Sequence, residues 1–358
     1  MKLYLLLKIL LAALLLSFPR ASNAQESAPD LPLNARQRAE LIETLIARLD
    51  EHYVLPEVAA RMGRDIRSRL RRREYDRITS SRAMAETLTT QLRAIGNDKH
   101  LGVRFSHEPM AASSGPTPPT PEERARFARM AASGNFGFDR VERLNGNIGY
   151  MELNGFIDPN LGAPTAIAAM NFLANTDGLI IDLRYNGGGV PGLAQLISTY
   201  LFEGPVHLHS IYWREGNRIQ QYWTLPYVPG PRYLNKPVYI LTSRSVFSAP
   251  ESFAYSLQAL GRVTVVGDTT AGGANPGREF RINDHFAMFI PTGRAVNPVT
   301  GTNWEGAGIK PDIAVPATGA LQTAHLTALR ALIKTSTSDR SRANLEAVLQ
   351  EESAKPPR

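Results

Sequence analysis

The sequence predicts an α/β fold, and two features of its second half support this. Residues 178–183 form a near-continuous apolar run, typical of a strand buried on both faces of a sheet. A glycine triplet and a helical pattern over 191–202 follow that run. The succession then repeats, with strands over 237–241 and 262–266 and a helix over 249–260 between them. Strands that alternate with helices indicate layered α/β structure.

Residues 35–95 predict a small helical domain, because apolar residues recur there at helical spacing in three stretches. Asn34 or Asp30 can cap the first helix, Pro56 restarts the second, and Gly96 stops the third. The apolar positions are Leu41, Ile42, Leu45, Ile46 and Leu49; Val58, Met62, Ile66 and Leu70; and Met84, Leu88, Leu92 and Ile95. Residues 101–106 alternate weakly and predict a strand.

Further elements are expected on either side of the repeated pattern. Strands are predicted over 141–144 and 148–153, around an Asn-Gly-Asn turn. Helices are predicted over 163–174, 321–334 and 342–351. The expected division of the chain is a signal peptide over 1–24, a helical N-terminal domain over 25–107, a Pro-rich linker or loop over 108–134, an α/β domain over 135–335, and a C-terminal helix and tail over 336–358.

The first 24 residues are typical of a secretory signal peptide. Lys2 and Lys8 accompany an apolar stretch, residues 9–18, and small residues end at Ala24 before Gln25. An uncleaved membrane anchor is the alternative, but the stretch is short for a membrane span. We therefore expect an exported, periplasmic or extracellular protein with no stable membrane span after cleavage. Loss of Lys2, Lys8 and Arg20 would lower the formal net charge from +7 to 7 − 3 = +4.

Composition excludes several classes of site. The chain has no cysteine, which excludes disulfides, thiol nucleophiles and zinc–thiolate sites. Arginines cluster between Arg61 and Arg82 and could bind nucleic acid or anionic lipid. The solvated face of a helix is the favoured interpretation, because no stacking aromatic residues interleave them. We expect no nucleic-acid partner.

Ser248 stands where the strand over 237–241 gives way to the helix over 249–260. A hydroxyl there lies beside unpaired backbone N–H groups and the positive end of a helix dipole, a place that can stabilise an oxyanion next to a nucleophile. The same position suits an ordinary N-cap serine, with Glu251 completing a capping box and Pro250 in the first turn. The local pattern leaves both interpretations open.

The glycine triplet, Gly187 to Gly189, follows the buried strand over 178–183. Ligands of open α/β sheets bind at that edge, and glycines let backbone N–H groups approach a ligand closely. The segment could form half of an oxyanion hole or a simple tight turn. Neither nucleotide-binding glycine motif is present, so a nucleotide site is weakly supported.

Seven histidines could supply a base. His100 lies where the helical domain passes into extended chain. His207 and His209 would share one face of a strand and could bind metal, but no third ligand clusters with them. Glu305 lies in a Gly-rich loop beside Trp304 and could orient a histidine.

Taken together, these segments resemble one family of serine peptidases, which includes C-terminal processing peptidases, the tricorn protease core and the modules of interphotoreceptor retinoid-binding protein. The matching pieces occur in family order over most of residues 35–335. They are Asp98-Lys99-His100, Asn135-Phe136-Gly137-Phe138, 146–151, 183–189, Leu241-Thr242-Ser243 through Glu251, Gly272-Gly273-Ala274-Asn275, and Trp304-Glu305-Gly306 to Pro311-Asp312.

The resemblance implies a crotonase-like, spiral ββα catalytic domain that hydrolyses peptide or protein substrates without a cofactor or metal. It implies Ser248 as the nucleophile, with the N–H groups of Ala249 and of Gly187 or Gly188 as the oxyanion hole. Processing peptidases use a lysine as base, but Gly272-Gly273 stands where it is expected, and no lysine occurs between Lys236 and Lys310. The tricorn-like alternative uses His100 as base and Glu305 behind it, although Lys99 stands where that branch has an extra serine.

Substrate recognition is expected to differ from that of the many relatives that carry a PDZ domain. The Pro-rich segment is far too short to contain a PDZ domain, so capture of a substrate's carboxyl end by that route is not expected. Arg184 or Arg278 could hold a substrate carboxylate, although a surface ion pair is the ordinary role of such residues. The rival function is that of the retinoid-binding relatives, a non-catalytic protein that binds an apolar ligand on the same fold. Retention of Ser248, His100 and Glu305 favours the hydrolase.

Overall fold

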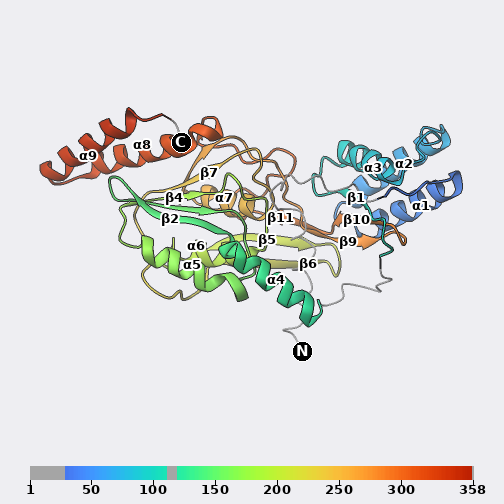
Figure 1. Cartoon of the computed structure of the whole chain (residues 1–358), viewed down its shortest axis with the longest axis horizontal. Helices are drawn as coiled ribbons and strands as arrows, with labels where there is room; N and C mark the ends of the chain where they lie inside the picture. The colour runs from blue at the N-terminus through green and yellow to red at the C-terminus, as the bar shows by residue number, and fades with distance from the viewer. Residues whose placement is uncertain (1–28, 111–118, 357–358) are drawn as a thin grey trace. The chain divides into compact units, whose positions relative to one another are not determined.

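The computed structural model describes residues 29–110 and 119–356, and their chain divides into two compact units. The first unit contains the described residues up to 110 together with 211–220 and 273–296. The second contains 119–210, 221–272 and 297–356. Figure 1 labels the helices and strands of both units. The predicted signal peptide and residues 111–118 of the Pro-rich segment lie outside the described residues.

Three helices and a small antiparallel sheet make up most of the first unit. The helices are α1 (Ala35–His52), α2 (Pro56–Arg71) and α3 (Ser81–Gly96), close to the positions that the apolar spacing predicts. Asn34 caps α1 through a capping box with Gln37. The sheet has the order β1-β10-β9, formed by β1 (Gly102–Phe105), β10 (Phe286–Pro291) and β9 (Gly277–Arg281).

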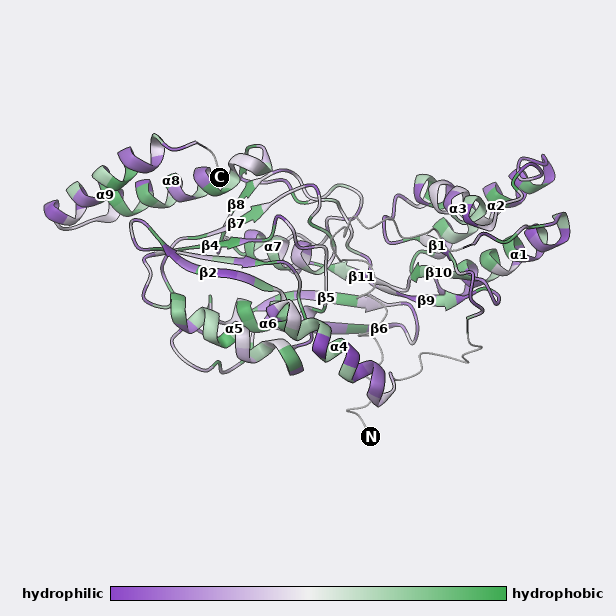
Figure 2. Ribbon diagram, viewed as in Figure 1, coloured by the Kyte–Doolittle hydropathy of each residue, from purple (hydrophilic) through white to green (hydrophobic). Residues whose placement is uncertain are grey.

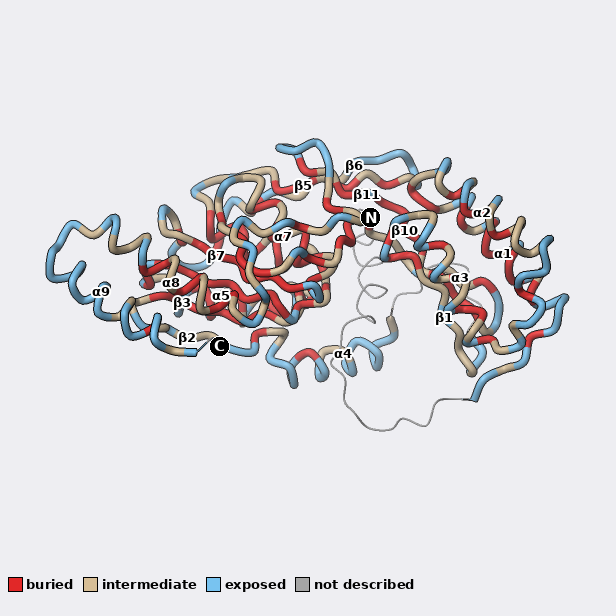
Figure 3. The backbone as a smooth tube through the Cα atoms, turned by 90° about the horizontal axis from the view of Figure 1, so that it is seen from above, coloured by how far each residue is buried: buried red, intermediate tan, exposed pale blue. Residues whose placement is uncertain are grey.

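One hydrophobic core joins these helices to the sheet. Apolar residues of α1, α2 and α3 pack with Ile282, Phe286, Met288 and Ile290 around and within β10. In Figure 3 the buried positions follow the inner faces of the three helices. The N-terminal helices therefore share their core with residues that lie more than 180 positions after the end of α3.

A six-stranded sheet forms the centre of the second unit. Its order is β12-β8-β7-β4-β3-β2, and all neighbours are parallel except β2 and β3. The strands are β2 (Phe138–Leu144), β3 (Ile148–Leu153), β4 (Gly178–Asp182), β7 (Val238–Thr242), β8 (Thr264–Gly267) and β12 (Ile313–Ala314). Every residue of β3, β4 and β7 is buried, which confirms the prediction of strands covered on both faces. Figure 2 shows the exposed edge strand β2 as largely hydrophilic, as sheet edges often are.

Helices cover both faces of this sheet. Alternate strand residues, among them Tyr150, Ile180 and Leu241, pack against α8 (Ala317–Thr335). On the other side lie α5 (Pro159–Leu173) and α6 (Pro191–Thr199), with α7 (Ala249–Ala259) packed against α6. The α/β prediction is therefore confirmed. The mostly exposed α9 (Asp339–Ser353) packs on α8.

A third sheet has the order β11-β5-β6, with β5 (His207–Trp213), β6 (Arg218–Trp223) and β11 (Gly293–Val296). The boundary between the two units falls within β5 and β6. Helix α4 (Pro121–Ser133) and the short 3-10 turn η3 (Asn135–Gly137) precede β2. Helix α4 falls within the segment predicted to be a linker or loop, although Thr120 and Glu123 form a capping box at its start.

Candidate active site

Ser248 lies in the turn between β7 and α7, as the sequence predicts. Its backbone has φ 71° and ψ −118°. A residue with a Cβ rarely adopts this conformation, which costs of order 1–3 kcal/mol and persists only where the surroundings impose it. The N-cap serines Ser80 and Ser338 have the negative φ of ordinary caps. The backbone at Ser248 thus differs from that of the other serine caps.

Glu251 holds this turn in place. It is fully buried, and its Oε2 accepts the N–H of Ser248 at 2.8 Å. Its Oε1 accepts the hydroxyl of Thr270 at 2.5 Å and the N–H of Gly272 at 2.7 Å. The return half of the predicted capping box is therefore present. The same carboxylate also fixes a second segment, 270–272, beside the Ser248 turn.

That second segment in turn positions the loop that carries Glu305. Gly272 O accepts the N–H of Gly306 at 3.0 Å, and the hydroxyl of Thr270 accepts the N–H of Ile309 at 2.8 Å. Gly272 has φ 88°, and a Cβ there would lie 2.8 Å from the backbone nitrogen of Gly308. Close approach of the two loops therefore requires glycine at 272. A side chain therefore does not fit at Gly272, the first glycine of the pair Gly272-Gly273.

The glycine loop follows β4, which is the neighbour of β7 in the sheet. Because the carboxyl ends of parallel strands meet at one edge, this loop and the Ser248 turn emerge at the same edge. Asn186 is fully buried, donates to Leu153 O at 2.9 Å and accepts the N–H of Gly188 at 3.1 Å. A Cβ on Gly189 would lie 2.1 Å from the carbonyl oxygen of Phe156, which pairs with it.

The expected oxyanion donors differ in availability. The N–H of Gly188 is already paired with Asn186. The N–H groups of Gly187 and Ala249 have no hydrogen-bond partner within the described part of the chain. Two backbone donors at this sheet edge are thus free to bind an acceptor.

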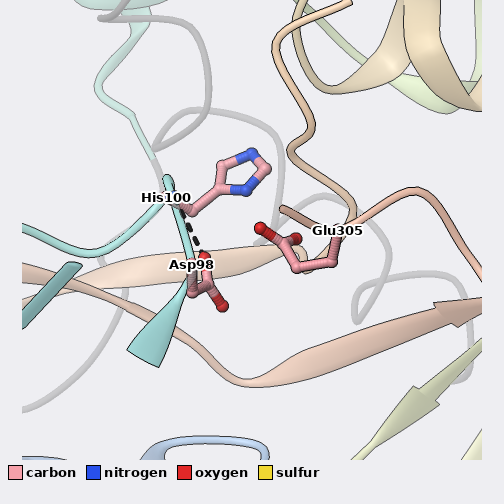
Figure 4. Close-up of side chains that lie close together, drawn as sticks. All are labelled: Asp98, His100 and Glu305. Atoms are coloured by element: carbon pink, nitrogen blue, oxygen red, sulfur yellow. Dashed lines mark hydrogen bonds between the residues drawn. The ribbon is translucent and has the colours of Figure 1, made fainter. Parts of the chain in front are cut away.

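His100 lies in the first unit, two residues before β1. Its backbone N–H donates to Asp98 Oδ1 at 3.0 Å, as Figure 4 shows. Its ring stacks on Phe289 of β10, with centroids 5.9 Å apart. Burial lowers the pKa of His100 to about 3, and the charge of Arg93 acts in the same direction. The imidazole is therefore neutral at pH 7, the form that can accept a proton.

Asp98 anchors the backbone of His100. It is buried, and its Oδ2 accepts the hydroxyl of Tyr53 at 3.1 Å and the side-chain amide of Asn275 at 2.9 Å. Burial raises the pKa of Asp98, and these hydrogen bonds oppose that rise. The segments that hold it are far apart in the sequence, which is why sequence reasoning assigned no role to Asp98 or Asn275.

The two arginines are engaged in ion pairs. Arg184 is buried, and its guanidinium forms a bidentate pair with Asp182, at 2.6 Å for the shorter contact, and donates to Ala317 O at 2.7 Å. Arg278, in the first unit, lies 3.4 Å from Glu215 and over the ring of Phe280. Arg278 matches the surface ion-pair alternative and Arg184 forms a buried ion pair, so neither guanidinium is assigned to a substrate.

The two histidines of β5 are also accounted for. His207 stacks on Trp223 at 4.7 Å and contacts the Ser210 hydroxyl, while His209 stacks on Tyr222 at 4.6 Å. No metal-ligand cluster of three or more groups in the described residues includes either of them.

Comparisons with known proteins agree with this fold. The model of peptidase family S41 matches residues 147–315, and the model of the N-terminal domain of peptidase S41 in eukaryotic IRBP matches residues 21–132. The chain belongs to peptidase family S41. The two matches follow each other as the N-terminal and catalytic parts of that family, so the resemblance seen in the sequence motifs is confirmed.

Individual relatives are more distant. A carboxy-terminal-processing protease of Bartonella bacilliformis is 30% identical over 178 residues, which make up 48% of this chain and 40% of that protein. The match thus spans less than half of the curated relative. The S41 chain shares its fold with a candidate peptidase of Parabacteroides merdae (TM-score 0.56, 20% identity, 89% of this chain and 98% of that one). Mature CPAF complexed with lactacystin gives TM-score 0.56 at 12% identity, covering 88% and 99%.

Proposed function

We propose that this S41 chain is an exported serine peptidase that hydrolyses peptide bonds through an acyl-enzyme. The observation that carries the proposal is the backbone of Ser248. A positive φ on a serine at a strand-to-helix turn is strain that simple capping does not require. Such a turn exposes the hydroxyl beside the free N–H groups of the helix start, which suits a nucleophile.

The proposed catalytic residues are Ser248, His100 and Glu305. Ser248 Oγ attacks the substrate carbonyl carbon while His100 takes the hydroxyl proton. The N–H groups of Ala249 and Gly187 hold the oxyanion. His100 then gives the proton to the leaving amine, and water repeats the sequence to release the acyl group. Glu305 fixes the imidazole tautomer and stabilises the imidazolium.

A histidine base is supported by the lack of any lysine between Lys236 and Lys310. Gly272-Gly273 stands where the processing branch has its lysine, and at Gly272 the close loop approach leaves no room for a side chain. The neutral state that burial gives His100 at pH 7 is the state that a general base needs. The negative charge of Glu305 would offset the unfavourable burial of the imidazolium during the reaction.

Export rests on the first 24 residues. Their charge, apolar stretch and small-residue end predict cleavage before Gln25. None of the helices in the described residues has the length and hydrophobicity that a membrane crossing requires.

The rival function, binding of an apolar ligand without catalysis, is favoured by one observation, the match of residues 21–132 to the IRBP N-terminal domain. A binding protein needs neither a strained serine nor free oxyanion donors. We therefore favour the peptidase, and one experiment separates the two functions.

The experiment uses protein recovered after export, with mass spectrometry to verify that it starts at Gln25. A fluorophosphonate probe should label it, and a peptide library should be cleaved. Ser248→Ala should remove labelling and lower kcat/KM at least about a thousandfold while the fold is kept. Ser245→Ala, an exposed serine in the same turn, is the matched control and should behave as wild type. Equal labelling of wild type and Ser248→Ala would overturn the proposal.

A further inference from the structure

The carboxyl ends of β4 and β7 lead into the two segments that carry the free oxyanion donors. The two strands pair in parallel, and backbone hydrogen bonds join them as far as Leu183, whose N–H donates to Leu241 O at 3.1 Å. Gly187 follows Leu183 by four residues, and Ala249 follows Leu241 by eight. Sheet pairing therefore does not by itself set the distance between the two donors.

A side-chain hydrogen bond links the two segments beyond the sheet. Ser243, the first residue after β7, is 8% exposed, and its Oγ donates to Arg184 O at 2.5 Å. Arg184 is the second residue of a turn in which Asn186 N–H donates to Leu183 O at 2.9 Å. The bond from Ser243 therefore fastens the glycine loop at the turn that directly precedes Gly187.

The same serine shapes the turn that leads to Ser248. Its Oγ accepts the N–H of Ser245 at 3.1 Å, and its carbonyl oxygen accepts the N–H of Val246 at 3.2 Å. Val246 is fully buried, and its own carbonyl oxygen accepts the N–H of Ala271 at 3.0 Å. One hydroxyl thus donates to the glycine loop and accepts from the Ser248 turn, as a serine hydroxyl can.

The contacts of Arg184 keep its carbonyl group in place. Its backbone N–H donates to Asp182 Oδ1 at 3.0 Å, and its buried guanidinium pairs with the same carboxylate. The guanidinium also donates to Ala317 O at 2.7 Å, at the start of α8. Ser243 is therefore bonded to a segment that is held on several sides, so its hydrogen bond fixes the Ser248 turn relative to the end of β4.

An oxyanion hole needs accurate placement of its donors. Both N–H groups must lie about 2.7–3.1 Å from one oxygen atom, and a shift of about 1 Å can cost about a hundredfold in rate. Gly187 and Ala249 belong to different loops, so any relative movement of the loops changes this geometry. A contact between the loops should therefore affect the transition state more than it affects substrate binding.

We propose that Ser243 is a positioning residue of the oxyanion hole, which holds the N–H groups of Gly187 and Ala249 at the separation that one oxyanion requires. The proposal rests on the proposed peptidase function and adds a residue to its site. Ser243 does not touch the reacting atoms in this role. It acts through Arg184 O on one loop and through Ser245 N–H on the other.

Ser243→Ala tests the proposal, with Thr176→Val as the matched control. Thr176 is also buried, and its hydroxyl donates to Leu173 O at 2.7 Å and lies 3.1 Å from the Tyr233 hydroxyl. Thr176 precedes β4, so it lies at the opposite edge of the sheet from Ser248. Each variant loses the hydrogen bonds of one buried hydroxyl, but only Ser243→Ala loses them beside the proposed oxyanion hole.

Kinetics with a peptide that the wild type cleaves separate positioning from stability. Ser243→Ala should lower kcat at least about tenfold and leave KM within about twofold, because the lost contact matters only in the transition state. The affinity for the aldehyde of the same peptide, whose adduct with Ser248 carries the oxyanion, should fall by the same factor as kcat. Thr176→Val should keep both values. An unchanged kcat in Ser243→Ala, or an equal loss of kcat in the two variants, would overturn the proposal.

Hydrogen exchange tests the positioning without turnover. In Ser243→Ala, amide exchange should accelerate in residues 184–188 and 245–249, because the contact between the two loops is lost. Thr176→Val should leave exchange in both segments as in the wild type. If the fluorophosphonate probe does not label Ser248, the peptidase function fails, and the exchange result then shows whether Ser243 links the loops. Wild-type exchange in both segments of Ser243→Ala would contradict the positioning role.

Discussion

A single backbone conformation separates two roles that the sequence alone leaves open for Ser248. Its residue type, the following proline and Glu251 fit an ordinary helix cap as well as a nucleophile turn. The sign of φ is not encoded locally here, because serine by itself disfavours the positive value. Contacts of Glu251 with segment 270–272, about 20 residues further along the chain, help to impose it. The backbone conformation that supports the proposed role of Ser248 is thus visible only once the fold is assembled.

Replacement of Ser248 by glycine tests this strain directly. Glycine adopts positive φ without a steric penalty, so Ser248→Gly should raise the free energy of unfolding by about 1 kcal/mol while it abolishes activity. Ser80→Gly is the matched control. Ser80 caps α3 with φ −90° and accepts the N–H of Ala83, so its replacement should lower stability by roughly a few tenths of a kcal/mol. Urea unfolding measures both changes, and a loss at both positions would contradict the strain argument.

The candidate site residues were predictable to different degrees. Motif order named Ser248, His100 and Glu305, because each lies in a recognisable segment. Their supports were not predictable, since Asp98 meets Tyr53 and Asn275 only in the folded chain. Asn186 was quoted within a motif, but its pairing with Gly188, which leaves Gly187 as the open donor, follows from the loop geometry.

At the scale of elements, hydrophobic pattern was a good guide where burial dominates. The strands β3, β4 and β7 are fully buried, and their apolar runs predicted them to within a residue or two. Less buried strands at the ends of sheets, such as β9 and β11, gave no such signal. Helix α4 was missed because the neighbouring prolines suggested irregular chain, although Pro121 stands in its first turn.

The start of α7 depends on one buried carboxylate, which gives an element-scale prediction. Glu251 accepts hydrogen bonds at both oxygens, from Ser248 N–H on one side and from Thr270 and Gly272 on the other. In Glu251→Gln, the amide group must face a backbone N–H whichever way it turns. We expect a loss of about 1–3 kcal/mol in stability and a lower kcat/KM, because the Ser248 turn loses its support.

Glu123→Gln is the matched control for that prediction. Glu123 occupies the same third helical position in α4 and accepts the N–H of Thr120 at 2.8 Å, but it is exposed. Water can replace its hydrogen bond, so the stability loss should be within about 0.5 kcal/mol. Thermal or urea unfolding of the two variants measures the difference. Equal losses would show that burial of Glu251 has no special effect.

At the scale of the whole molecule, sequence order and unit membership differ. The chain contributes residues 211–220 and 273–296 to the unit that its N-terminal helices begin. Local periodicity predicted the three helices but not the strand that completes their core, because pairing of β1 with β10 joins residues more than 180 positions apart. Such long-range contacts leave no local trace in a single sequence.

Because the N-terminal helices and β10 share one core, a destabilising substitution in β10 should also affect the helices. Met288 in β10 is fully buried among residues of α1 and α3, so Met288→Ala should cost about 2–5 kcal/mol. Hydrogen exchange should then accelerate in α1, α3 and β10 together, because they depend on the same core. Met151→Ala, an equally buried methionine in β3, should accelerate exchange in the central sheet and leave α1 and α3 protected. Unchanged exchange in α1 after Met288→Ala would show that the N-terminal helices hold together without β10.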